Sequence, residues 1–101
     1  MTRVVISPRA DGDFDDIIEY LTGRGGVPLA RDYVRRFDEV YDRLGEFPGS
    51  GAARPKFGSL ARLVTVTPYF IIYDWDTSAD TVTVLRIIRG SRRLTRRAVR
   101  G

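Results

Sequence analysis

The sequence has 101 residues, of which 43% are hydrophobic and 30% charged, and it carries a formal net charge of +4. These values are ordinary for one compact globular domain, so we expect residues 1–101 to form a single domain, and the absence of a long apolar run or a secretory leader indicates a cytoplasmic protein without a membrane contact. The chain holds no cysteine and no histidine, which excludes disulfides, thiolate nucleophiles, Cys/His zinc sites and histidine acid–base catalysis.

The first half of the chain predicts a short strand followed by two amphipathic helices. Residues 4–6 are an apolar strand candidate, and Ser7-Pro8 then supplies a helix N-cap and a first-turn proline. Apolar residues recur at helical spacing in two series, Ala10, Phe14, Ile17, Ile18 and Leu21, then Ala30, Tyr33, Val34, Phe37, Tyr41 and Leu44. Glycines at 23, 25 and 26 separate the series and Pro28 opens the second, so we expect a helical hairpin.

Acidic residues fill the remaining faces of the first predicted helix. The pairs Asp13/Asp16 and Asp15/Glu19 have a spacing that would allow a divalent cation to bind. The helix dipole also stabilises carboxylates near a helix N-terminus. A solvated helix face is therefore the favoured interpretation, and we expect neither a metal site nor a cofactor.

The second half predicts a loop and then a β-meander. Residues 49–59 (GSGAARPKFGS) are typical of an exposed loop, which carries Arg54 and Lys56. Three segments rich in β-branched and aromatic residues follow: LARLVTVT, YFIIYDW and TVTVLRII. The nearly continuous apolar run of YFIIYDW predicts a central strand buried on both faces. The expected fold is thus α+β, in the order βααβββ, with the helical hairpin packed on a small, mainly antiparallel sheet.

Positive charge is concentrated in the second half. Residues 1–50 carry 7 basic and 10 acidic residues, whereas residues 51–101 carry 10 basic and 3 acidic ones. Residues 89–101 form a basic carboxy-terminal tail, which would present one arginine face if it were helical, although like charges at that spacing oppose the helix. Such asymmetry suggests a surface for nucleic acid, an acidic protein or another polyanion.

Several cations lie at loop and strand ends that a meander could bring together: Arg54, Lys56, Arg62, Arg86, Arg89, Arg92 and Arg93. An anion-binding face is the favoured hypothesis. The alternative is dispersed solubilising charge, with Arg86 paired to an acid such as Asp74. The aromatic residues mostly fit core packing, and Tyr69, beside Pro68 at a turn, is the expected exception.

Three segments and the hairpin before them resemble the ParE/RelE superfamily of type II toxin–antitoxin toxins. The segments are RPKFGSLARLV from Arg54, PYFIIYDW from Pro68 and TVTVLRIIRGSRR from Thr81, and the resemblance covers essentially the whole chain. It implies a growth-inhibiting, plasmid-stabilising toxin that forms a hetero-oligomer with a cognate ParD-like antitoxin. We expect Tyr33, Phe37 and Tyr41 to contact that antitoxin.

The resemblance leaves two activities open. RelE-like members cut messenger RNA on the ribosome, and their loop and strand cations match Arg54, Lys56, Arg62 and Arg92. Those enzymes usually also use a tyrosine or histidine near the carboxy terminus for proton transfer, and residues 94–101 contain neither. ParE-like members inhibit DNA gyrase without a catalytic apparatus of their own. The ParE-like branch is therefore favoured, although Arg89 stands where many of its members carry a histidine.

The resulting prediction is a gyrase inhibitor without intrinsic catalysis. Its predicted target-binding residues are Arg86, Arg89, Arg92, Arg93 and Tyr69. A ribosome-dependent messenger RNA endoribonuclease is the first alternative, and an inactive toxin-derived binding domain is the second. Truncation after Ile88 is expected to abolish toxicity if gyrase is the target.

Overall fold

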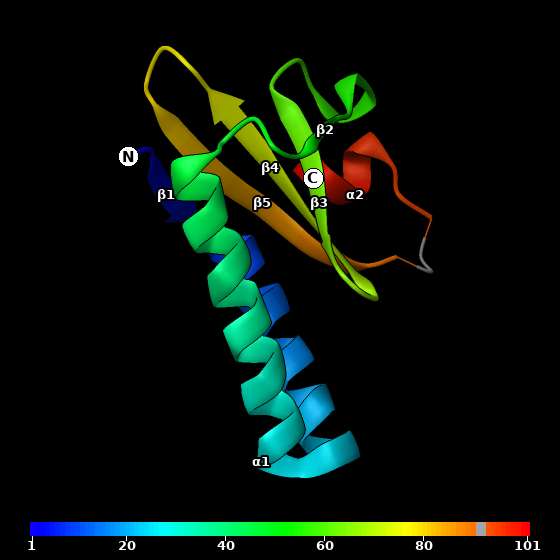
Figure 1. Ribbon diagram of the computed structural model, residues 1–101. Helices are drawn as coiled ribbons and strands as arrows, with labels where there is room; N and C mark the ends of the chain where they lie inside the picture. The colour runs from blue at the N-terminus through cyan, green and yellow to red at the C-terminus, as the bar shows by residue number, and fades with distance from the viewer. Residues whose placement is uncertain (91–92) are drawn as a thin grey trace.

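The computed structural model describes residues 1–90 and 93–101. Its elements are β1 (Arg3–Ile6), α1 (Pro8–Glu46), β2 (Ala52–Ala53), the short 3₁₀ helix η1 (Pro55–Phe57), β3 (Ala61–Val66), β4 (Tyr69–Asp76), β5 (Thr81–Arg89) and α2 (Arg96–Arg100). The strands form a five-stranded sheet in the order β1-β5-β4-β3-β2. The helix α1 covers one face of this sheet, and α2 with η1 covers the other (Figure 1).

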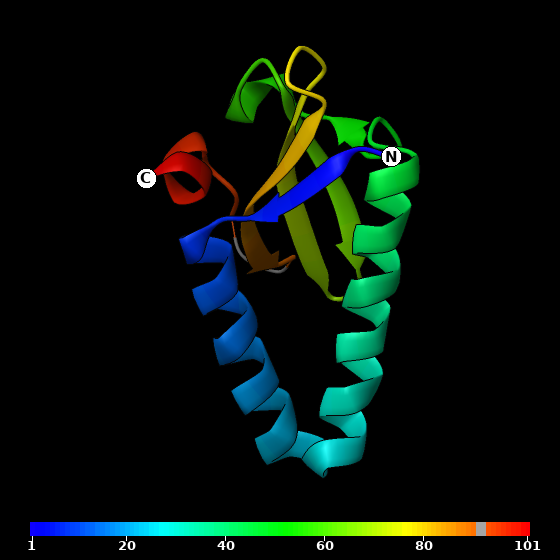
Figure 2. The same ribbon diagram turned by 90° about the vertical axis from the view of Figure 1, so that its left-hand side faces the viewer.

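The long element α1 is a hairpin of two helical arms. Ser7 Oγ accepts the Ala10 N–H at 3.1 Å, and Pro8 occupies the first turn. Gly26 has φ 74° and ψ −171°, which interrupts the helix in a region where a side chain would be strained, and Pro28 follows in the second arm. Figure 2 shows the arms diverging from the tip of the hairpin toward the sheet. The predicted hairpin and its glycine turn are confirmed.

The strands β3, β4 and β5 form an antiparallel meander, and β1 pairs in parallel with β5. Because α1 is the crossover between β1 and the rest of the sheet, β1 can run in the same direction as β5. The strand β4 lies in the middle of the sheet, and its residues Ile71 and Ile72 are both 0% exposed although they point to opposite faces. The prediction of a central strand buried on both faces is confirmed.

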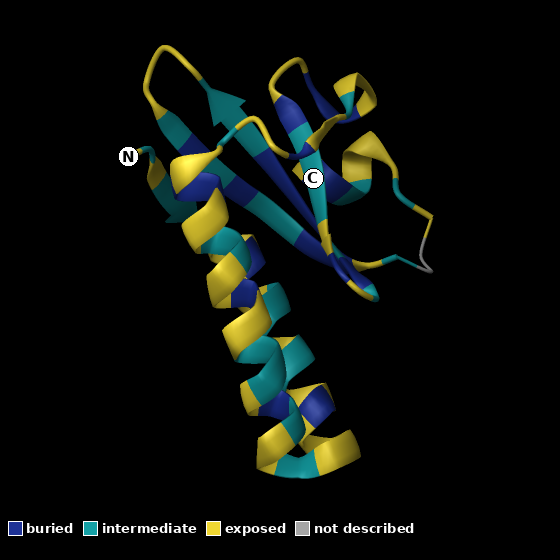
Figure 3. Cartoon of the chain, viewed as in Figure 1, coloured by how far each residue is buried: buried dark blue, intermediate teal, exposed yellow. Residues whose placement is uncertain are grey.

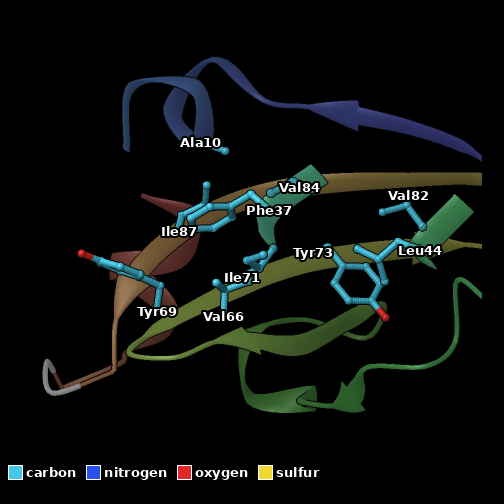
Figure 4. Close-up of a cluster of buried hydrophobic side chains, with 10 residues drawn as sticks. All are labelled: Ala10, Phe37, Leu44, Val66, Tyr69, Ile71, Tyr73, Val82, Val84 and Ile87. Atoms are coloured by element: carbon cyan, nitrogen blue, oxygen red, sulfur yellow. The ribbon is translucent and has the colours of Figure 1, made fainter. Parts of the chain in front are cut away.

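Each face of the sheet has its own apolar core. On the α1 side, Phe37 and Leu44 pack against Ile71, Tyr73 and Val84 (Figure 4). On the other side, Ile72 and Ile88 pack with Phe57 of η1, Ala61 at the start of β3 and Val99 of α2. Exposed positions on α1 follow its outer side and the hairpin tip (Figure 3). None of the described helices is long and apolar enough to cross a membrane.

The expected exposed loop at residues 49–59 is wrong in part. Gly51 and Phe57 are buried, and the segment forms β2 and η1. Phe57 stands alone among glycines and prolines, so the sequence around it has no apolar periodicity that would predict its burial. Its burial depends on how the segment packs against the sheet, which the sequence does not show. The segment is therefore part of the second core.

The continuous arginine-faced helix considered for residues 89–100 does not form. Arg89 ends β5, and the C-terminal helix begins at Arg96. Val99 is 2% exposed and packs in the second core. Burial of this one apolar side chain helps to offset the repulsion between the arginines that surround it.

Candidate functional surfaces

Arg86 joins α1, β5 and α2. Its Nε and Nη2 donate to Asp13 Oδ2 and Oδ1 at 2.7 and 3.0 Å, and its Nη1 donates to the Ala98 carbonyl at 2.5 Å. Asp13 Oδ2 also accepts the Ile87 N–H at 2.9 Å. The strand β1 ends at Ile6, opposite Val84. Asp13 therefore satisfies an edge amide of β5 that β1 does not reach.

This contact corrects two sequence-based expectations. The suggested Arg86–Asp74 pair is wrong, because Asp74 accepts from Arg100 Nη2 at 2.6 Å. Asp13 does not lie on a solvated helix face, since its side chain and that of Arg86 are each only 16% exposed. The hydrogen bonds that Arg86 donates to the Asp13 carboxylate raise the pKa of Arg86 above its ordinary value. Arg86, predicted to bind a target, is thus committed to contacts that hold the fold together.

Arg62 and Tyr73 fix the loop that follows α1. Arg62 Nη1 donates to the carbonyls of Gly49 at 3.1 Å and Gly51 at 2.7 Å. The Tyr73 hydroxyl donates to the Pro48 carbonyl at 2.7 Å and accepts the Gly51 N–H at 2.9 Å. Burial raises the pKa of Tyr73, while the Gly51 N–H and the Arg62 charge act in the opposite direction. Both side chains therefore position backbone at this end of the sheet.

Replacing Tyr73 with phenylalanine removes both hydrogen bonds and keeps the ring. We expect the free energy of unfolding to fall by about 1 to 2 kcal/mol, because two backbone groups lose their partner at a buried position. Urea denaturation would measure the loss. The matched control is Tyr20→Phe, since Tyr20 is 50% exposed and its variant should stay within about 0.5 kcal/mol of the wild type. Equal stability of both variants would contradict the proposed role of the hydroxyl.

The other cations of the suggested ribonuclease site lie close to the start of β3. The backbone N–H of Arg54 donates to the Ala61 carbonyl at 2.8 Å. Lys56 Nζ lies 5.0 Å from the centre of the Phe57 ring. Lys56 is exposed, and Arg54 is half-buried. Arg62 follows Ala61 in β3 and pairs with Ala53 of β2, but its guanidinium donates to the carbonyls of Gly49 and Gly51. Arg92, the fourth cation of that set, lies outside the described residues.

A shallow hollow of about 410 Å³ lies between the first arm of α1 and the sheet. It is lined by Asp16, Ile17, Tyr20, Tyr69 and Arg89. Tyr69 and Arg89 are directly paired at the start of β4 and the end of β5. The structure therefore brings two of the predicted target-binding residues to one site.

Tyr69 is not the exposed exception that its turn position suggested. The residue is 3% exposed and belongs to the core on the α1 side, where its ring meets that of Tyr33 edge to face at 6.0 Å. Burial raises the pKa of Tyr69, and the nearby Arg89 partly opposes this rise. Arg89 itself is exposed. Arg89 thus supplies an accessible positive charge at this hollow, which the exposed Asp16 also lines.

The three aromatic residues predicted to bind an antitoxin differ in accessibility. Phe37 is 0% exposed and belongs to the core of the folded chain, and its contact with an antitoxin stays a prediction. Tyr33 is half-buried and donates its hydroxyl to the Thr67 carbonyl at 3.0 Å. Tyr41 lines a hollow of about 310 Å³ between β1 and the second arm, and burial raises its pKa to about 12. Only Tyr33 and Tyr41 offer partly exposed surface.

The C-terminal helix places arginines around the buried Val99. Arg100 donates its Nε to the Phe57 carbonyl and pairs with Asp74. Arg9, from the start of α1, donates Nη2 to the Ala98 carbonyl at 3.4 Å. Three more arginines of this region, Arg93, Arg96 and Arg97, are exposed. Arg9, Arg96 and Arg97 were absent from the predicted sites, since no local pattern shows that the C-terminus returns to the start of α1.

Comparison with known proteins identifies the family. The family model described as the ParE toxin of the type II toxin-antitoxin system, parDE, matches residues 4–94. The chain belongs to the ParE toxin family. Toxin ParE3 of Caulobacter vibrioides is 29% identical to this ParE toxin over 90 residues, which cover 89% of the chain and 88% of ParE3. Toxin ParE1 of the same organism is 41% identical over 46 residues, or 46% of the chain and 48% of ParE1.

A solved structure has the same fold. It is described as the chromosomal ParDE TA system from P. aeruginosa, and its chain superposes with a TM-score of 0.72 at 23% sequence identity. The match covers 88% of this ParE toxin and 96% of the other chain. The predicted superfamily, its favoured ParE-like branch and the α+β fold class are confirmed. As the toxin of a type II system, this ParE protein has an antitoxin partner.

Proposed function

We propose that this ParE toxin inhibits DNA gyrase and that a cognate ParD-like antitoxin neutralises it. The family match over residues 4–94 supports an activity of the ParE branch. The observation that carries the choice between the two branches is the position of Arg62. Its Nη1 donates to the carbonyls of Gly49 and Gly51, so this part of the guanidinium holds the loop and does not serve a transferred phosphate.

The ribonuclease alternative also needs a group that transfers a proton near neutral pH. The chain has no histidine. Tyr73 hydrogen-bonds to the same loop as Arg62, but it is 0% exposed, and its hydroxyl donates to the Pro48 carbonyl and accepts the Gly51 N–H. Burial raises its pKa further from neutrality. These contacts favour inhibition by binding over catalysis by the toxin.

The proposed target surface lies at the end of β5 and beyond it. Arg89 is exposed beside the hollow at Tyr69, and Arg93 is exposed before α2. Arg86 supports this surface from inside through Asp13 and Ala98. Arg92 stays in the proposal on the strength of the sequence alone. Because gyrase acts on DNA inside the cell, the proposal places the toxin in the cytoplasm.

DNA supercoiling by purified gyrase tests the proposal. Toxin released from its antitoxin should inhibit supercoiling in a dose-dependent manner and should increase double-strand cleavage of the plasmid on the same gel. The variant Arg89→Ala/Arg93→Ala should inhibit at least about tenfold less well if each arginine makes a charge-assisted hydrogen bond. The control Arg31→Ala removes an exposed charge from the second arm of α1. Folded toxin that leaves gyrase unaffected but cleaves messenger RNA on ribosomes would support the RelE-like alternative.

The antitoxin is proposed to contact the partly exposed aromatic surface of the second arm. Tyr33 and Tyr41 each combine an apolar ring with a polar hydroxyl, which suits a protein interface. Tyr41 lines the hollow beside β1, and Tyr33 lies beside the β3–β4 turn. A partner that covers both residues would lie along the second arm.

A further inference from the structure

We propose that exposed arginines around α2 bind the phosphate backbone of double-stranded DNA. We call this set the α2 arginine surface, and it consists of Arg9, Arg93, Arg96 and Arg97. Its biological role rests on the proposed gyrase function, since gyrase acts on DNA, but the binding itself can be measured without gyrase. Figure 2 shows α2 beside the start of α1, where Arg9 reaches the Ala98 carbonyl.

The helix that carries this surface is fixed to the body of the protein. Val99 is 2% exposed and packs with Phe57, Ile72 and Ile88. Arg100 binds Asp74, and Arg86 binds both Asp13 and the Ala98 carbonyl. Two arginines and one valine therefore hold α2 on the sheet, so the backbone that carries Arg96 and Arg97 is already ordered before an anion binds.

Among residues 1–90 and 93–101, the acidic side chains that form ion pairs do so with arginines outside the α2 arginine surface. In the part of the chain that the structure describes, Arg9, Arg93, Arg96 and Arg97 form no ion pair with a carboxylate. The first turn of α2 contains no acidic residue. Arg93 precedes α2, and Arg96 and Arg97 are its first two residues, so three like charges lie within five residues of the chain. A bound anion would reduce the repulsion between them.

The chemistry of the surface favours DNA over a protein. The core of a protein interface is depleted of charge and enriched in apolar side chains, whereas a DNA interface is strongly positive. Here the apolar residues point inward, since Val99 is buried and Leu94 packs against the second core. The large hydrophobic residues that are exposed lie outside residues 93–101, at Met1, Tyr20, Val27, Phe47 and Leu60. The side chains exposed on the α2 arginine surface are guanidinium groups, whose planar arrangement of N–H donors matches the oxygens of a phosphate.

Fluorescence anisotropy with a labelled DNA duplex of arbitrary sequence tests the inference. Antitoxin-free toxin is titrated into the duplex between about 50 and 200 mM salt. The triple variant Arg93→Gln/Arg96→Gln/Arg97→Gln should bind roughly tenfold or more weakly at low salt, and its salt slope should fall by about 3, one for each lost phosphate contact. The variant with lysine at the same three positions should keep most of the affinity, because phosphate binding needs the charge.

The matched control is Arg3→Gln/Arg24→Gln/Arg31→Gln, which removes three exposed arginines on β1 and α1. If both glutamine variants lose affinity equally, net charge alone binds DNA and the inference is wrong. It is also wrong if the α2 variant is folded and binds DNA like the wild type. Supercoiling assays run beside these titrations separate the two proposals: DNA binding at the α2 surface without gyrase inhibition would overturn the gyrase proposal and leave this one standing.

Discussion

Replacing Phe37 with alanine is expected to lower the free energy of unfolding by about 4 kcal/mol. The ring is 0% exposed and lies 5.4 Å from Phe14, 6.2 Å from Tyr69 and 6.4 Å from Tyr41, measured between ring centres. Truncation removes the buried ring and leaves a cavity where both arms of α1 meet the sheet. Because small domains are stable by only about 5 to 15 kcal/mol, this is a large share of the total. Urea denaturation, followed by the fluorescence of Trp75, measures it.

The same variant separates a core role for Phe37 from a role in antitoxin binding. The variant Phe37→Leu keeps most of the apolar volume and should lose much less stability than the alanine variant. Tyr33→Ala is the comparison for binding, since Tyr33 is half-buried on the same arm and its loss should weaken antitoxin binding at a smaller cost in stability. A Phe37→Ala toxin of wild-type stability that binds its antitoxin weakly would show that Phe37 is a contact residue after all.

Replacing Asp13 with alanine is expected to cost about 3 kcal/mol. The change leaves the largely buried Arg86 guanidinium without its bidentate partner, and it leaves the Ile87 N–H at the edge of β5 without an acceptor. It also weakens the link between α1 and β5, on which the position of α2 depends through Ala98. Urea denaturation would give the loss. Amide exchange at Ile87 should increase, because that amide loses its protection.

Two further variants test this assignment. Asp15→Ala removes an exposed carboxylate from the same arm and should change stability by no more than about 0.5 kcal/mol. The double variant Asp13→Ala/Arg86→Met removes both charges and should recover part of the loss, because no unpaired charge remains buried. If Asp13→Ala and Asp15→Ala were equally stable, the Asp13–Arg86 pair would contribute nothing measurable to the fold.

The sequence by itself determined β1, both arms of α1, the three strands β3 to β5 and the family of this protein. Helical spacing of apolar residues predicted both arms of α1, and the glycines before Pro28 predicted the turn between them, which the backbone of Gly26 confirms. The unbroken apolar run of β4 predicted its central position. These features depend on residues that are neighbours in the chain, so a local pattern is sufficient to report them. The resemblance to ParE toxins likewise rested on segments of contiguous residues.

Only the tertiary structure decided which charged side chains are exposed and which form hydrogen bonds or ion pairs that stabilise the fold. Arg86 and Asp13 are 73 residues apart, and they meet because α1 packs beside β5. Arg62 turns to the loop carbonyls, Phe57 and Val99 fill the second core, and Arg9 joins the C-terminal arginines. A charged residue has the same appearance in a sequence whether it is paired or free. Its partner is set by strand register and by the crossover through α1, which bring distant residues together and follow no local period.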